Sequence, residues 1–186
     1  MIEGAAEGAG LGIRFLKHLT RTRLLLHIVD LSSVVMDGED NPVDAIKQLQ
    51  HEIAEFSPAL TQRKQWLVLN KTDLLDDEAL SGVEQEVKQA FPDADALHLI
   101  STVTRQGLDQ LVHDLMIELE TVWRAEEESE ELREQEFALQ QLMQQQGRER
   151  ITELANRRRE ARIAARSSGS SDDDDWDDVD VEYVHD

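Results

Sequence analysis

The sequence has 186 residues, a formal net charge of -21 and no cysteine. This length suits one domain with extensions, while the lack of cysteine excludes disulfides and thiolate metal sites and favours a reducing compartment. No stretch has the length and hydropathy of a signal peptide or a membrane span. We therefore expect a cytoplasmic protein without a membrane span, in which any contact with nucleic acid is local because acids outnumber bases 40 to 19.

The first segment is rich in glycine, with four glycines in residues 1–12, and leads into a short helical face that ends near Thr20. A glycine-rich lead into a helix is typical of a mobile loop or of a phosphate cradle. The segment lacks the Gly-Lys-Ser/Thr ending of a phosphate-binding loop. We interpret it as a flexible loop, and its role stays open.

Three apolar runs predict buried strands, each ending at polar residues. They are residues 24–30, 67–69 and 96–100, which stop at Asp30, Asn70 and Ser101. Helices are expected from Asn41-Pro42, from Asp76 or Asp77 to Pro92, and over residues 108–122, the last with Val112 in its buried stripe. The alternation of strand and helix predicts an α/β fold with parallel strands joined by right-handed crossovers. His27, inside the first strand, is expected to be a satisfied core residue.

The central strand leads into Asn70, Lys71, Thr72 and Asp73, at the sheet edge where open α/β proteins bind ligands. A carboxylate only accepts hydrogen bonds, so Asp73 suits the two adjacent donors of guanine, N1-H and the exocyclic amine. Asn70 can donate to acceptors on the other edge of the base, the stem of Lys71 can lie against the ring, and Thr72 can be nearly any residue. The alternative is a turn or a helix N-cap, which Asn and Asp also favour.

Residues 123–166 are expected to form a charged helical extension that is weakly docked at best. Its second half is basic, with seven arginines against three glutamates in residues 147–166. This stripe is either a solvated helix face or a contact for RNA or an acidic partner. Residues 167–186 carry nine acids and no base, which predicts a disordered acidic tail that serves either a protein partner or solubility alone.

These motifs resemble the Obg-type GTPases, bacterial ribosome-associated GTP-binding proteins. Residues 2–5, 7–12 and 15–16 are similar to the segment after the family's third GTP-binding motif, Asn70-Lys71-Thr72-Asp73 to the fourth, and Ser101-Thr102-Val103 to the fifth. The similarity covers residues 1–122. It implies guanine binding by these two motifs, with a backbone N–H near Thr102, where the family normally has alanine, contacting the guanine oxygen.

The resemblance implies the second half of a doubly wound P-loop GTPase domain, with a parallel sheet. The whole protein would hydrolyse GTP with magnesium and assist assembly of the large ribosomal subunit, with that subunit or its rRNA as its partner. The resemblance also implies that an Asp-x-Pro-Gly motif, the phosphate loop and the magnesium-binding Thr precede Met1. Without that loop the chain lacks magnesium ligands, and we identify no catalytic residue. We expect residues 1–122 to be the C-terminal portion of such a domain, inactive alone. The alternative function is a non-catalytic interaction module that uses the arginine-rich helix and the acidic tail.

Overall fold

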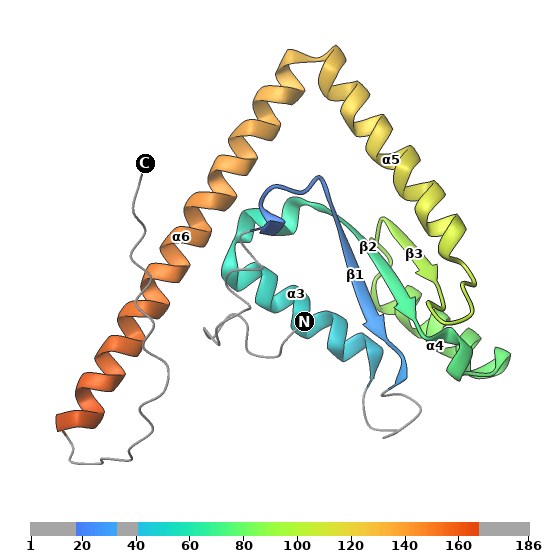
Figure 1. Cartoon of the computed structure of the whole chain (residues 1–186), viewed down its shortest axis with the longest axis horizontal. Helices are drawn as coiled ribbons and strands as arrows, with labels where there is room; N and C mark the ends of the chain where they lie inside the picture. The colour runs from blue at the N-terminus through green and yellow to red at the C-terminus, as the bar shows by residue number, and fades with distance from the viewer. Residues whose placement is uncertain (1–17, 33–40, 168–186) are drawn as a thin grey trace.

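A computed structural model describes residues 18–32 and 41–167, and in this part the chain is an α/β protein with a three-stranded parallel sheet (Figure 1). The strands are β1 (Leu24–Asp30), β2 (Lys64–Asn70) and β3 (Ala96–Leu99), in the order β1-β2-β3. The helices are α3 (Pro42–Phe56), α4 (Asp77–Ala90), α5 (Leu108–Glu128) and α6 (Glu130–Ser167), with the short 3-10 turns η1 (Pro58–Gln62) and η2 (Thr72–Leu74). The predicted parallel strands are confirmed, while the glycine-rich segment before residue 18 and the acidic tail lie outside the described residues.

The starts of two helices follow from the capping residues that the sequence supplies. Asn41 precedes α3, its Oδ1 accepts from the Val43 N–H at 2.7 Å, and proline occupies the first helical position. Asp76 caps α4 in the same way, accepting from the Ala79 N–H at 2.8 Å. These caps fix the residue at which each helix begins.

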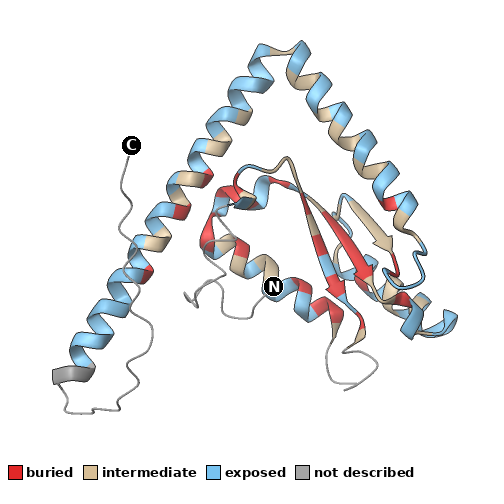
Figure 2. Ribbon diagram, viewed as in Figure 1, coloured by how far each residue is buried: buried red, intermediate tan, exposed pale blue. Residues whose placement is uncertain are grey.

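The sheet is the middle of three layers, with β2 buried on both faces (Figure 2). Leu67 and Leu69 pack with α3 and α4 on one face, and Trp66 and Val68 pack with α5 on the other. The prediction that Val112 belongs to the buried stripe of α5 is wrong, because its side chain is 56% exposed. The row that meets the sheet contains Leu108, Leu111 and Leu115, and Val112 lies beside this row.

The prediction that the helical extension is weakly docked is also wrong. The side chain of Met143, on α6, is fully buried in a cluster with Leu25, Ile53, Phe56 and Leu60. A Cβ added at Gly147, one turn further along α6, would lie 2.7 Å from Phe56 Cζ, so glycine allows the helix to approach this ring. The sparse apolar residues of α6 suggested weak contact. One flexible methionine, Met143, and one glycine a turn later, Gly147, are nevertheless enough to pack the helix against Phe56.

Polar side chains also join α6 to η1. We call this contact, with the cluster around Met143, the seam. Gln146 Oε1 accepts from the Ser57 hydroxyl at 2.7 Å and from the Ala59 N–H at 2.9 Å. Glu136 receives bonds from Arg63 and an ion pair from Arg23, at 2.6 and 3.0 Å. Burial opposes the charged form of Glu136, but the bonds from Arg63 and Gln140 and the charges of Arg63 and Arg23 together outweigh it, so the pKa lies below its ordinary value. These side chains are thus engaged with each other, although the buried Nε of Arg63 has no hydrogen-bond partner.

His27 lies in the core as predicted, but it is not satisfied. The residue is only 8% exposed, and its Nδ1 has no hydrogen-bond partner. Burial penalises the charged ring and lowers the pKa of His27 to about 4. The imidazole is therefore neutral in the folded protein near neutral pH.

Candidate functional site at the carboxyl edge of the sheet

The ends of the three strands meet at one edge of the sheet. Asp30 and Asn70 are partners in the register of β1 and β2, and Leu31 N–H continues the pairing to Asn70 O at 3.1 Å. On the other side, Ile100 N–H donates to Leu69 O at 2.9 Å, which places Ser101 next to the end of β2. The residues that the sequence singled out after β2 and β3 are therefore brought together.

The side chain of Asn70 bridges the two segments that form the edge. Its Oδ1 accepts from the Lys71 N–H at 2.8 Å and from the Thr102 N–H at 3.3 Å. Because both partners are donors, the carbonyl end of the amide faces the protein and the NH₂ end is left with two donors. Asn70 thus joins both predicted motifs while keeping a donor group for a ligand.

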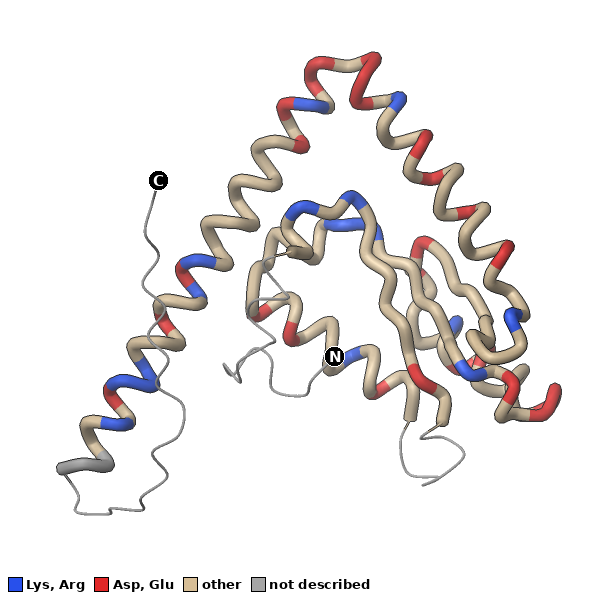
Figure 3. Tube along the Cα trace, viewed as in Figure 1, with Lys and Arg blue, Asp and Glu red and all other residues tan. Residues whose placement is uncertain are grey.

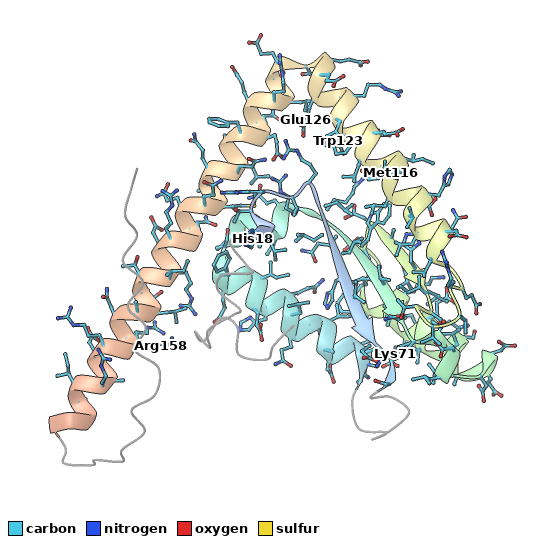
Figure 4. All side chains as sticks on the ribbon, viewed as in Figure 1. His18, Lys71, Met116, Trp123, Glu126 and Arg158 are labelled. Atoms are coloured by element: carbon cyan, nitrogen blue, oxygen red, sulfur yellow. The ribbon has the colours of Figure 1, made fainter. Side chains whose placement is uncertain are left out.

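Lys71 lies in the left-handed backbone region, with φ 68°, and turns the chain away from β2 (Figure 4). Its Nζ forms an ion pair with Asp30 Oδ2 at 2.6 Å and donates to Ser32 Oγ at 3.2 Å. Burial opposes the charge on Asp30, yet the bonds from Lys71 and Ser32 leave its pKa below the ordinary value. Lys71 therefore spans from the second strand to the first across the edge. Ser32 is a partner that sequence reasoning missed.

Thr72 differs from its prediction, because its side chain is fixed. The residue is 5% exposed, and its N–H and hydroxyl both donate to Ile100 O, at 3.2 and 3.0 Å. The position is therefore not open to nearly any residue. The hydroxyl ties the turn to the strand next to it.

The carboxylate of Asp73 is oriented by Ser101. The Ser101 hydroxyl donates to Asp73 Oδ1 and accepts from the Thr104 N–H at 3.0 Å, and the residue is fully buried. Asp73 itself is exposed, and its Oδ2 receives no hydrogen bond from the described residues. Asp76, not Asp73, caps α4, and η2 has no side-chain cap. The cap alternative therefore does not account for the carboxylate of Asp73, which keeps acceptor capacity for a ligand.

The loop after β3 returns sharply at Gly107, a residue that sequence reasoning did not select. Gly107 has φ 72°, and a Cβ there would lie 2.2 Å from Leu99 O, so only glycine fits. The return places Thr102 and Val103 at the solvent side of the edge, with the Val103 side chain 78% exposed. The signal in the sequence was a glycine immediately before an apolar helix, typical of a positive φ.

The fold and this edge define an α/β protein with a polar site at the carboxyl ends of parallel strands. No protein-family model matches the chain. In residues 18–32 and 41–167, no three acidic or histidine side chains gather to hold a metal ion. None of the described helices is long and apolar enough to cross a membrane.

Proposed function

We propose that the carboxyl edge of the sheet binds the guanine base of a nucleotide, as the base-recognition part of an Obg-type GTP-binding protein. The observation that carries the proposal is the Asp73 carboxylate, held by Ser101 through one oxygen and leaving the other as an acceptor toward solvent. The Asn70 amide, with its donor end left over, lies at the end of the adjoining strand. An anionic acceptor and a neutral donor thus stand at one edge.

This pair selects guanine over adenine. Guanine presents N1-H and an exocyclic amine side by side, and a carboxylate accepts from both. Adenine places a ring acceptor beside its amine, so Asp73 would face a lone pair. Asn70 can donate to the N7 or O6 acceptor of guanine, as amides do in base readout. The backbone N–H of Val103, which bonds to no described residue, is a further donor for O6.

In this proposal the described sheet is the second half of a doubly wound P-loop domain. The 186 residues contain no Gly-x-x-x-x-Gly-Lys-Ser/Thr sequence, so contacts to the phosphates and to magnesium are supplied by residues outside them. Each good base contact contributes about 1–3 kcal/mol. Since a 1 mM dissociation constant corresponds to about 4 kcal/mol, this chain alone should bind the base at millimolar concentration. GTP hydrolysis and a role in assembling the large ribosomal subunit belong to the intact protein.

Amide chemical shifts of the ¹⁵N-labelled chain test the proposal, with millimolar GMP and AMP as probes. We expect GMP to shift the amides of residues 70–73 and 102–103, and AMP to leave them nearly unchanged. Asp73→Asn should abolish the GMP shifts. Asp93→Asn is the matched control for this variant, because it neutralises an exposed carboxylate that follows α4 and not β2. Equal shifts with both nucleotides, or none at this edge, would reject guanine recognition.

The second candidate, a non-catalytic interaction module, is favoured by the distal part of α6, where residues 155–164 are exposed. In that case the polar edge of the sheet has no ligand, and Asp73→Ala leaves partner binding unaltered. The GMP titration separates the two functions, because only base recognition requires the carboxylate of Asp73.

A further inference from the structure

The distal part of α6 projects from the rest of the described structure. Leu154 is buried, and residues 155–164 after it are all exposed. Arg150, four residues before Leu154, forms an ion pair with Glu55 of α3 at 3.3 Å. Arginine positions gather in this part of the helix (Figure 3). An isolated helix end of this kind is marginally stable in water.

Four arginines of this helix, Arg148, Arg158, Arg159 and Arg162, form what we call the arginine surface. Arg148, Arg158 and Arg159 form no ion pair with a described residue, whereas Arg150 and Arg157 both pair with Glu153. Arg158 and Arg162 are four residues apart, so their charges repel each other on the helix. The helix dipole stabilises cations only in the last turn of a helix, and Arg148 lies far from that turn. The dipole therefore does not stabilise the charge of Arg148. Arg148, Arg158 and Arg159 therefore carry positive charge that no ion pair with a described residue neutralises.

One segment of the sequence has the complementary charge and begins where α6 ends. Residues 172–186 contain nine acids and no base, the most acidic stretch in the chain. They follow Ser168-Gly169-Ser170-Ser171, a composition typical of a flexible linker. Such a linker lets the chain reverse direction directly after the helix.

We propose that residues 172–186 fold back along α6 and bind the arginine surface within the same molecule. Fifteen extended residues reach at most about 50 Å, while the helix from Arg148 to Arg162 is about 21 Å long at 1.5 Å per residue. The segment is therefore long enough to cover the whole surface. A short linker also gives it an effective concentration of about 1 mM, so weak individual ion pairs suffice.

The composition of the segment fits this helix in a second way. Trp176 and Tyr183 stand among the acids, and arginine side chains stack on aromatic rings. Ile163, on the same helix, is 57% exposed and offers an apolar contact. Once bound, the segment occupies the surface that an external polyanion such as RNA would use. RNA is therefore a competing occupant of the arginine surface.

A spin label placed near the end of the full chain tests the proposal. The sequence has no cysteine, so His185→Cys gives a single attachment point and leaves all nine acids unchanged. We expect paramagnetic broadening of the amides of residues 147–164 at low salt. The broadening should fall severalfold at 0.5 M salt, because screening shortens to a few ångström there. It should also fall severalfold in the triple variant Arg148→Gln, Arg158→Gln, Arg159→Gln.

The control variant is Arg133→Gln, which removes an exposed arginine from the other half of α6 and should leave the broadening unchanged. Unchanged dispersion of the other amides shows that each variant is folded. Three outcomes overturn the proposal: broadening absent from α6, broadening unaffected by the triple variant, or broadening that passes from a labelled to an unlabelled molecule. If broadening is absent and the triple variant loses binding to a uridine 20-mer, the surface belongs to RNA instead.

Discussion

The seam between α6 and η1 and the carboxyl edge of the sheet are both lined by polar side chains, but they use them differently. In the seam, Gln146 bonds to both of its partners and Glu136 to two arginines. At the edge, Asn70 and Asp73 are held through one oxygen each and keep hydrogen-bonding capacity toward solvent. Polar groups that satisfy each other hold elements together, whereas polar groups that are oriented but only partly satisfied are available to a ligand.

Met143→Ala should produce the largest effect, and it acts on the seam alone. The side chain is fully buried, so its loss leaves a cavity and should cost about 2–5 kcal/mol of unfolding free energy. Urea denaturation measures this loss. Leu142→Ala is the control, because the neighbouring leucine is 42% exposed and should cost much less. Similar losses in both variants would mean that α6 is not seated on Met143.

Acid should lower the free energy of unfolding through protonation of His27, in the core next to the seam, before it affects the carboxyl edge of the sheet. The pKa of His27 is about 4 in the folded protein and near 6.5 when unfolded, so protonation favours the unfolded chain. The contribution of neutral His27 to the free energy of unfolding is fully present above pH 6.5. As the pH falls toward 4, the free energy of unfolding decreases by about 3 kcal/mol. His27→Leu should remove this loss between pH 6.5 and 4.5. Below that range the lowered pKa of Glu136 adds a further loss.

Gly147→Ala tests how closely α6 approaches α3. The added Cβ would meet Phe56 at 2.7 Å, and such overpacking should cost about 1–3 kcal/mol. Gly82, in α4, is the matched control because nothing lies within 4 Å of its added Cβ. Gly82→Ala should stabilise the protein by about 0.5–1 kcal/mol through helix propensity. Thermal unfolding of the two variants should therefore shift in opposite directions.

Asp73→Asn should change binding and leave the seam intact. The amide presents a donor to the N1-H of guanine, which should weaken GMP binding by about 1–3 kcal/mol. Xanthine has a carbonyl where guanine has its amine, so XMP should gain relative to GMP. Parallel titrations by amide shifts measure the preference. An unchanged ratio would show that Asp73 does not contact the base.

Thr102→Ala should have the smallest effect, below about 0.5 kcal/mol on stability, as for other exposed sites. Its side chain is exposed, and the described contact to Asn70 comes from its backbone N–H, which alanine retains. GMP titration of this variant should match the unmodified chain. A clear loss of binding would show that the hydroxyl itself contacts the ligand.

The strands and their polar ends were predictable because apolar runs stop at Asp30, Asn70 and Ser101. Burial on both faces holds only for β2, since Ile28 in β1 is 59% exposed and no residue of β3 is buried. The orientation of Asp73 by Ser101 was not predictable, since that bond joins residues 28 apart and depends on how two loops pack. The seating of α6 was missed for a related reason. Met143 and Gln146 stand in a glutamine-rich stretch, where composition predicts a solvated helix, and only their partners on α3 and η1 make them structural.

The bond from Ala59 to Gln146 joins residues that are 87 apart in the sequence. During synthesis at about 5–20 residues per second, α3 and η1 therefore emerge roughly 4–17 s before the helix that covers them. Throughout that interval Phe56 and Leu60 have no Met143 to pack against. The seam therefore forms late in synthesis. The nascent chain is most exposed to aggregation, or to binding by a chaperone, just before α6 emerges.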